Sequence, residues 1–235
     1  AENEKERMRT NLMRAVSHDL RTPLTTIYGA SSAILENDLT EEKKKELLQG
    51  ICQDAEWLSR MVENLLSVTR VDGEDMHIIK TPTVLDELID SVLVKLKKRY
   101  PDYDVEIDIP EECVVIPMDA MLMQQVLINL LENAMLHAEG MTELLLKVSV
   151  SDNKAIFEIK DNGIGIDEDR VNALLKGSFE SKKPSADVGK NNAGIGLSVC
   201  ASIIKAHGGK ITAENQRKGG ALFRFMLDTE DVEDE

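Results

Sequence analysis

The sequence predicts an α+β protein, with an N-terminal helical hairpin followed by a sandwich of one mixed β-sheet with helices on one face. Over about the first seventy residues, apolar side chains recur every three or four positions, which is typical of amphipathic helices. Beyond that point, short β-like runs alternate with helical patterns, and some runs are close enough to form hairpins. The 235 residues are 42% hydrophobic and 30% charged, so the chain can build two modest cores.

The first element is a pair of long helices joined by a polar turn at residues 36–40, where Thr40 is the expected N-cap of the second helix. Because one pair of amphipathic helices has too small a core to stand alone, we expect two hairpins to form a four-helix bundle through residues 5–71 of a homodimer. The alternative is a hairpin packed on its own chain's second domain, which the regular spacing disfavours. The apolar positions are Leu12, Val16, Leu20, Leu24, Ile27 and Ile34, then Leu48, Ile51, Ala55, Leu58, Val62, Leu65 and Thr69.

The pattern changes after the Asp-Gly pair at residues 72–73, which is typical of a helix end. We therefore expect a first domain at 1–73, a second at 74–228 and a solvated acidic tail at 229–235. In the second domain the expected strands are 76–80, 105–109, 144–150, 155–160, 210–214 and 221–227. The expected helices are about 84–99, 119–137, 167–176 and 195–207.

The charge and the cysteines limit the partners and the compartment. A net charge of -15 argues against nucleic acid as a partner, because a phosphate backbone would repel the chain. Cys52, Cys113 and Cys200 are far apart and have no metal-ligand spacing, which suits a reducing cytoplasm. No run approaches the length of about 18 apolar residues that a membrane span needs. A cytoplasmic location is therefore expected, and a membrane part of a receptor would lie outside this sequence.

One histidine lies off the apolar stripe of the first helix. His18 points toward water, Asp19 is its neighbour, and Thr22 lies one turn further on the same face. Taken alone, this arrangement favours a solvated helix surface over a functional group. Of the other histidines, His207 is expected at a helix C-terminus, where it would interact favourably with the helix dipole, and His77 is given no role.

The helix expected at 119–137 carries a polar stripe. Asn129, Asn133 and His137 are spaced by four residues and therefore share one face. Asparagine is a poor helix former, so two on one face indicate a ligand about as readily as a surface helix with incidental amides. Glu132 flanks the stripe, and an amide oxygen near a carboxylate suits Mg²⁺ that is shared with phosphate oxygens.

The segment DNGIGI at residues 161–166 directly follows an expected strand. Asp161 can accept a hydrogen bond from an exocyclic amine such as that of adenine. Gly163 and Gly165 allow the backbone to turn and to approach a ligand closely. The simpler alternative is a common Asn-Gly turn between two elements.

A second glycine-rich stretch places Gly194 and Gly196 at the start of the helix expected at 195–207. Backbone N–H groups and the positive end of the dipole make a helix N-terminus a site for phosphate. The polar segment 177–192 before it contains Lys182, Lys183 and Lys190, which is typical of a lid over an anionic ligand.

In this order and spacing, the motifs resemble the cytoplasmic catalytic part of bacterial sensor histidine kinases. The phosphoacceptor box is residues 18–23, the asparagine box is 129–133, and the glycine boxes are 161–165 and 194–196. The resemblance implies the Bergerat-type ATP-binding fold that these kinases share with gyrase and Hsp90-like ATPases. The phrases HDLRTPLT and GGALFRF are similar to those of the potassium-sensing KdpD-type kinases.

The resemblance also implies the site residues, with ATP and Mg²⁺ as cofactors and a response regulator receiver domain as partner. His18 would attack the γ-phosphate, Asp19 would hold the proton of the other ring nitrogen, and Thr22 would position a water that removes phosphate from the regulator. Asn133 would bind Mg²⁺ and Asp161 would bind adenine. The residues that would line the pocket or contact the phosphates are Asn129, His137, Gly163, Gly165, Gly194 and Gly196.

Three positions depart from the family pattern. Leu136 stands where a basic residue usually reaches the phosphates, Asn192 replaces a glycine of the second glycine box, and Phe179 is one phenylalanine where two are typical. These departures support an alternative function, a nucleotide-sensing dimeric scaffold or a phosphatase with weak kinase activity. An ATP-driven clamp or chaperone is disfavoured by the N-terminal bundle with its exposed histidine.

Overall fold

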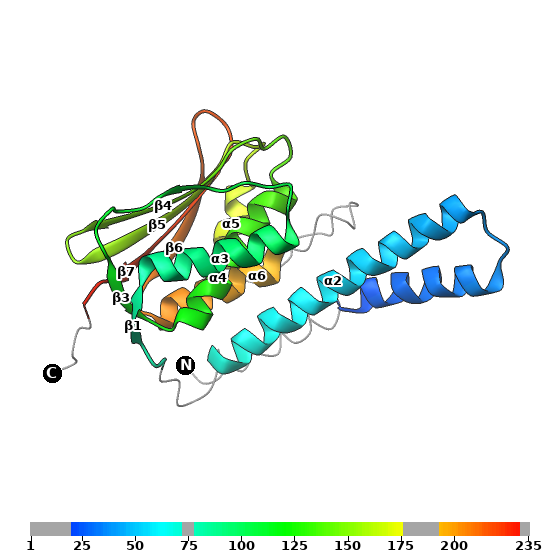
Figure 1. The fold of residues 1–235 in the computed structure, drawn as a ribbon, viewed down its shortest axis with the longest axis horizontal. Helices are drawn as coiled ribbons and strands as arrows, with labels where there is room; N and C mark the ends of the chain where they lie inside the picture. The colour runs from blue at the N-terminus through cyan, green and yellow to red at the C-terminus, as the bar shows by residue number, and fades with distance from the viewer. Residues whose placement is uncertain (1–19, 72–77, 176–192, 231–235) are drawn as a thin grey trace. The chain divides into compact units, whose positions relative to one another are not determined.

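The computed structural model describes residues 20–71, 78–175 and 193–230 (Figure 1). The chain divides into two compact units, Ala1–Leu66 and Ser67–Glu235. Within the described residues, no helix combines the length and the apolar character that a membrane crossing requires.

The first unit is the expected helical hairpin. A helix over residues 20–36 precedes α2, Glu41–Val71. Thr40 caps α2 as predicted, because its Oγ1 accepts a hydrogen bond of 3.3 Å from the backbone N–H of Lys43. Both helices of the single hairpin leave large apolar side chains exposed, namely Leu24, Tyr28, Leu35, Leu48 and Val62.

The second unit is built on a five-stranded mixed sheet with the order β2-β4-β5-β7-β6. Only β2 and β4 pair in parallel, and the other neighbours are antiparallel. Asp152 and Asn153 join β4 to β5 with positive φ angles of 52° and 59°, as a two-residue hairpin turn requires. The strands are β2 Glu106–Asp108, β4 Leu144–Ser151, β5 Lys154–Asp161, β6 Lys210–Asn215 and β7 Ala221–Asp228.

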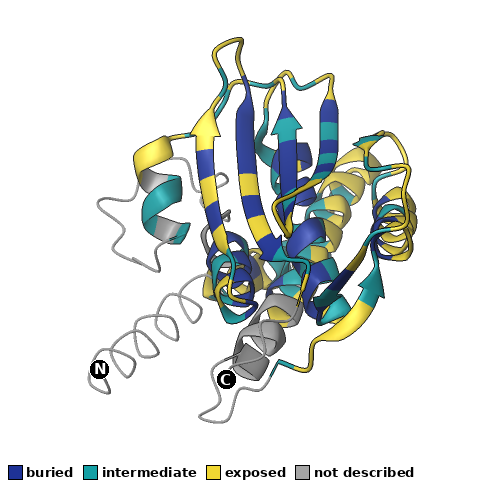
Figure 2. Cartoon of the chain, turned by 90° about the vertical axis from the view of Figure 1, so that its left-hand side faces the viewer, coloured by how far each residue is buried: buried dark blue, intermediate teal, exposed yellow. Residues whose placement is uncertain are grey.

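Helices cover one face of this sheet, as predicted (Figure 1). Buried residues, dark blue in Figure 2, run along the central strands and the helices packed on them. Phe157 of β5 and Phe225 of β7 stack in the core with ring centroids 4.6 Å apart. The helices are α3 Leu85–Arg99, α4 Ala120–His137, α5 Glu168–Leu175 and α6 Ala193–Ala206, close to the expected bounds.

The expectations of a strand at 76–80 and of a single sheet were wrong. Residues 78–80 are irregular, and residues 76–77 lie outside the described residues. The strand begins later, as β1 Thr81–Val84, and pairs with β3 Val115–Met118 in a separate two-stranded sheet. Pro82 and Pro117 face each other in this pair. Proline has no N–H to donate to a neighbouring strand, so the local sequence of these two segments does not predict β-strands.

Candidate functional site

The polar stripe on α4 is half-buried, while the opposite side of the helix is packed in the core. The Oδ1 of Asn129 accepts a hydrogen bond of 3.0 Å from Gln125 Nε2, and the Asn129 side chain is also hydrogen-bonded to the thiol of Cys200 in α6. Asn129 therefore links two helices. Among the described residues, the amide of Asn133 has no hydrogen-bond partner, so it is the group on α4 that is available to a ligand.

The carboxylate of Glu132 forms an ion pair with a neighbouring helix. It is 6% exposed and forms an ion pair with Arg99 of α3, with an Nη1 to Oε1 distance of 2.7 Å. A buried carboxylate needs such a partner, and the pair joins α3 to α4. The ion pair engages one oxygen of Glu132, and the carboxylate as a neighbour of Mg²⁺ beside the asparagine stripe stays a prediction. The described residues contain no group of three His, Cys, Asp or Glu side chains that could hold a metal ion.

Asp161 lies at the end of β5 and is 6% exposed. Its Oδ1 accepts a hydrogen bond of 2.9 Å from the backbone N–H of Gly163. Its carbonyl oxygen accepts one of 2.8 Å from Gln216 Nε2, which also donates to the carbonyl of Ala221 at 3.1 Å. These contacts fix both the backbone and the carboxylate of Asp161. The described residues give its second carboxylate oxygen no hydrogen-bond partner, so that oxygen can accept from a ligand.

The first glycine box packs against the C-terminal end of α4. A Cβ on Gly163 would lie 2.8 Å from the Cβ of Ala138, the C-cap residue of α4. The N–H of Ile164 donates to the carbonyl of Glu139 at 3.2 Å, and Asn162 Oδ1 accepts from the N–H of Thr142 at 2.8 Å. The structure therefore brings Asp161 and its loop to the end of the helix that carries Asn133 and His137.

The other side of the loop is held by Asn215 at the end of β6. Its Oδ1 accepts from the N–H of Ile166 at 2.7 Å, and its Nδ2 donates to the carbonyl of Ile166 at 2.8 Å. Gly165 has a φ of +86°, and a Cβ there would meet Asn215 Oδ1 at 2.4 Å. The sequence analysis did not predict Asn215 and Gln216. The Gly219–Gly220 pair that follows them is a local signal for a turn, but the sequence does not show that this turn lies against Asp161.

The second glycine box lies in the first turn of α6, which begins at Ala193, two residues before the expected start. Gly196 is half-buried, and the side chains that follow it are buried against the core. One of these is Cys200, which donates to the carbonyl of Val126 at 3.7 Å. Burial raises the pKa of the Cys200 thiol to about 12, so it is protonated and unsuited to nucleophilic chemistry.

His207 does not play the expected role of a charged partner for the helix dipole. The residue is 3% exposed, and its Nε2 accepts a hydrogen bond of 3.0 Å from the backbone N–H of Asp119. Its Nδ1 lies 2.8 Å from the carbonyl oxygen of Ile203, to which it donates. Burial lowers the pKa of His207, which agrees with a neutral ring held in one tautomer.

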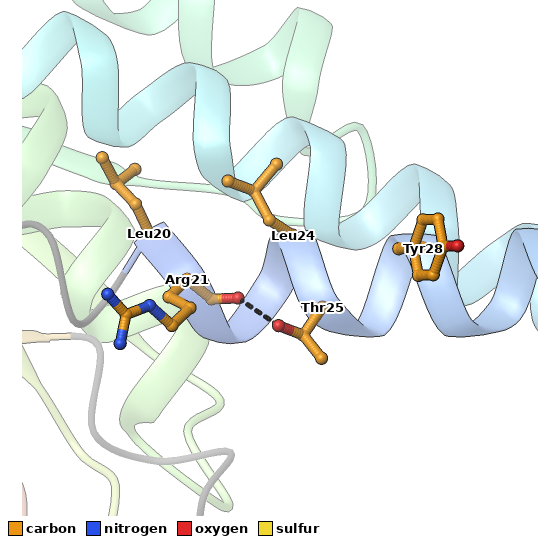
Figure 3. A pocket seen from close by; sticks show the side chains of 5 residues that line it. All are labelled: Leu20, Arg21, Leu24, Thr25 and Tyr28. Carbon is orange, nitrogen blue, oxygen red and sulfur yellow. Dashed lines mark hydrogen bonds between the residues drawn. The ribbon is translucent and has the colours of Figure 1, made fainter.

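The predicted catalytic residues His18 and Asp19 lie outside the described residues. So do the other residues discussed from the sequence in these segments, namely His77, Phe179, Lys182, Lys183, Lys190 and Asn192. Thr22 is described and exposed. Beside it, the same helix has a shallow hollow lined by Leu20, Arg21, Leu24, Thr25 and Tyr28 (Figure 3). In Figure 3, Leu20 and Leu24 point to one side of the helix, and the Thr25 hydroxyl donates to the carbonyl of Arg21 at 2.8 Å.

Two family models match the chain. Residues 8–74 match the His Kinase A (phospho-acceptor) domain. Residues 118–231 match the Histidine kinase-, DNA gyrase B-, and HSP90-like ATPase.

Relatives and solved structures agree with these matches. The Sensor protein KdpD of Clostridium acetobutylicum is 39% identical over 231 residues, which are 97% of this chain and 26% of that protein. The Escherichia coli (strain K12) Sensor protein KdpD is 34% identical over 227 residues, 96% of this chain and 25% of that protein. The chain thus spans about a quarter of the length of these curated relatives.

Among solved structures, the Acinetobacter baumannii histidine kinase AdeS is 25% identical with a TM-score of 0.68, covering 91% of this chain and 98% of that one. Histidine kinase ThkA, solved in complex with the response regulator protein TrrA, shares the fold with a TM-score of 0.71 at 24% identity, covering 97% of this chain and 66% of that one. The chain therefore belongs to the sensor histidine kinases, an enzyme family, and it is a KdpD-like catalytic part with the family's phospho-acceptor and ATP-binding domains.

Proposed function

We propose that this chain uses ATP to phosphorylate His18 and then passes the phosphoryl group to an aspartate of a response regulator receiver domain. One observation carries the proposal. In the ATPase domain, the hydrogen-bonded loop that begins at Asp161 is packed on the end of the helix that carries Asn133, whose amide has no hydrogen-bond partner among the described residues. The same chain contains a phospho-acceptor domain whose matched range includes His18.

Asp161 recognises adenine in this proposal. Its second carboxylate oxygen would accept from the exocyclic amine, because Gly163 already occupies the first. Gly163 and Gly165 let the loop backbone lie close to the nucleotide, and Gly194 and Gly196 do the same for the phosphates at the start of α6. Asn129 and His137 complete the stripe on α4. Asn129 lines the pocket while it links α4 to α6, and His137 contacts the phosphates from the last turn of α4.

Mg²⁺ fits this site with Asn133 as its protein ligand. The ion prefers oxygen ligands and commonly keeps waters and substrate phosphates around it, so the amide oxygen of Asn133, which has no partner among the described residues, would be the contribution of α4. Bound there, Mg²⁺ would reduce the negative charge on the phosphates. Glu132 is paired with Arg99 through Oε1.

His18 acts as the nucleophile. Its attacking nitrogen must be unprotonated, and Asp19 accepts a hydrogen bond from the N–H of the other ring nitrogen, which fixes the tautomer and raises the nucleophilicity of the ring. The bond from this nitrogen to the γ-phosphorus forms as the bond to the β,γ-bridging oxygen breaks, and ADP leaves. A regulator aspartate then takes the phosphoryl group from the histidine.

A homodimer is part of the proposal. The single hairpin exposes Leu24, Tyr28 and Leu35 on one helix and Leu48 and Val62 on α2, with exposed fractions between 48% and 85%. Leu48 and Val62 are four helical turns apart and lie on the same side of α2. Two copies that bury these side chains against each other would form a four-helix bundle.

We place the domain boundaries at 1–73 and 74–228, with a tail at 229–235. A cytoplasmic location is supported by the exposed free thiols of Cys52 and Cys113, which suit a reducing compartment. A membrane part would belong to a sensor region outside this sequence.

A second activity is supported by one observation. Leu136 is 50% exposed near the end of α4, so no basic side chain at this position reaches toward the phosphates. Such a site favours weaker ATP-driven phosphorylation relative to removal of phosphate from the regulator, for which Thr22 positions the water. The chain would then act mainly as a nucleotide-sensing phosphatase or scaffold.

Incubation with γ-labelled ATP and Mg²⁺, followed by a panel of purified receiver domains, tests both steps. Label should first accumulate on the chain and then move to one receiver. A chain that dephosphorylates a labelled receiver without ever becoming labelled would support the second activity instead.

A further inference from the structure

Two helices frame the proposed nucleotide site. α4 carries Asn133 in its last turns, and α6 carries Gly194 and Gly196 in its first turn. At the opposite ends of the same two helices lies His207, which directly follows α6 and contacts Asp119, the N-cap residue of α4. This contact joins residues that are 88 positions apart in the sequence.

The chemistry of this contact allows one arrangement of the ring. A backbone N–H can only donate, so Nε2 of His207 must accept from Asp119, at 3.0 Å. The proton then sits on Nδ1, which donates to the carbonyl of Ile203 at 2.8 Å. His207 satisfies the N–H of the N-cap residue of α4, a donor that has no intrahelical partner. Its ring also adds a second hydrogen bond to the Ile203 carbonyl, which already accepts from the backbone N–H of His207 at 3.1 Å.

The two helices run antiparallel and in step from this contact. Two helical turns before His207, Cys200 donates to the carbonyl of Val126, which lies two turns after Asp119. The Cys200 thiol is also hydrogen-bonded to Asn129. Gly196 lies one turn from Cys200 on α6, and Asn133 lies one turn from Asn129 on α4. The axial register set at His207 is therefore the register in which the first turn of α6 lies beside Asn133.

We propose that His207 is a positioning residue for the nucleotide site: its bridge between Asp119 and Ile203 fixes the axial register of α4 and α6. That register sets the spacing between the Asn133 amide and the phosphate-binding start of α6. The inference rests on the proposed function, because it concerns a nucleotide bound between these helices. Asp161 is on β5 and is positioned by other contacts, so His207 acts on the phosphate side of the site.

Two substitutions test the two hydrogen bonds of the His207 ring separately. In asparagine the amide nitrogen occupies the place of Nδ1, so H207N keeps the bond to Ile203 and loses the link to Asp119. In glutamine the amide oxygen reaches the place of Nε2, so H207Q keeps the link to Asp119. MgATP is titrated into the full chain by calorimetry. We expect Kd to rise about fivefold or more in H207N and to stay within about threefold of wild type in H207Q, with unchanged stoichiometry in both.

The stoichiometry distinguishes positioning from a merely structural role. A general loss of folded protein would reduce the number of sites and leave Kd unchanged, and that result would overturn the inference. Equal Kd changes in H207N and H207Q, or a wild-type Kd in H207N, would also overturn it. The matched control is Lys205→Asn, an exposed position in the last turn of α6, which should keep the wild-type Kd.

If H207N does not fold, H207Q still tests the inference, because a Kd more than about threefold above wild type at full stoichiometry contradicts it. A wild-type chain that binds no MgATP would contradict the proposed function, and the inference with it. Wild-type binding that is abolished by Asn133→Ala but unchanged by H207N contradicts the inference alone.

Discussion

Gly220 lies so close to Asp161 that a Cβ on Gly220 would fall 1.9 Å from the carbonyl oxygen of Asp161. Gly220 also has a φ of +85°, which side chains rarely adopt. The turn between β6 and β7 is thus pressed against the end of β5, and the Gln216 side chain bonds to the same carbonyl oxygen at 2.8 Å. The position of Asp161 depends on this contact between distant parts of the sequence.

Gly220→Ala should therefore displace the end of β5 and weaken ATP binding about tenfold or more, with a lower Tm. The control is Gly140→Ala, because Gly140 has a similar φ of +76° but has nothing within 4 Å of the added Cβ. Both variants place alanine at a positive φ, and only Gly220→Ala adds the clash with Asp161. The difference between their Kd values in calorimetry therefore measures the effect of the clash. Equal losses of affinity in the two variants would contradict the role of the close approach.

Asp161→Asn should weaken ATP binding selectively. The substitution places an amide donor opposite the donor of the adenine amine, and an unpaired polar group costs about 1–3 kcal/mol, which is about fivefold to 150-fold in Kd. Asp152→Asn is the matched control, since Asp152 lies in the β4–β5 turn and asparagine tolerates its positive φ. If titration gives the same Kd for Asp161→Asn as for wild type, adenine is bound elsewhere.

The same residues show how far the sequence could predict the site. Asp161, Gly163 and Asn133 belong to local motifs, and periodicity placed them correctly on a strand end, a loop and a helix. Asn215, Gln216 and Gly220 were missed because they act through contacts with residues about fifty positions away, which no local pattern encodes. The role predicted for His207 was wrong for the same reason, since its ring is buried and accepts a hydrogen bond from Asp119, which is 88 positions away in the sequence.

The secondary structure also shows that local patterns could be predicted and that contacts between distant residues could not. The long amphipathic helices and the hydrophobic strands of the main sheet have clear periods and were predicted within a few residues. β1 and β3 are short, and each contains a proline that faces the other across the pair. Proline removes a ladder donor, so the local signal argued against strands that tertiary pairing nevertheless forms.

Stability should fall on mild acidification because of His207. Burial lowers its pKa in the folded state below the ordinary value of 6.5, so the unfolded chain binds the proton more readily. The free energy of unfolding is then highest above the unfolded pKa and decreases as the pH falls below 6.5. The nearby charges have opposite effects, because Asp119 raises this pKa and Lys80 lowers it.

Urea unfolding of wild type and H207Q at pH 7.5 and 5.5 measures this contribution. Wild type should lose more unfolding free energy between the two pH values than H207Q, which cannot titrate at this position. Both proteins share the carboxylates and the other histidines, so the contributions of those groups to the pH dependence of the unfolding free energy cancel in the comparison. Identical losses would show that His207 does not contribute to the pH dependence.

Thr22→Ala should separate two activities. Removal of the hydroxyl spares autophosphorylation, in which ATP and Asp19 dominate, but it removes the group that orients water for dephosphorylation of the regulator. We expect the dephosphorylation rate to fall about tenfold or more while most autophosphorylation remains. The control is Thr26→Ala, because the Thr26 hydroxyl donates to the carbonyl of Thr22 at 3.2 Å and serves the helix only. A parallel fall of both rates and of Tm in Thr22→Ala would reject a special role for its hydroxyl.

The most direct measurement is the chemical identity of the phosphorylated residue. The chain is incubated with γ-labelled ATP and Mg²⁺, and the label is then challenged with acid and with base. We predict a label that is lost in acid and kept in base, as phosphohistidine requires, in wild type and in His77→Ala but absent from His18→Ala. Label that persists in His18→Ala, or that is stable in acid, would contradict phosphorylation of His18.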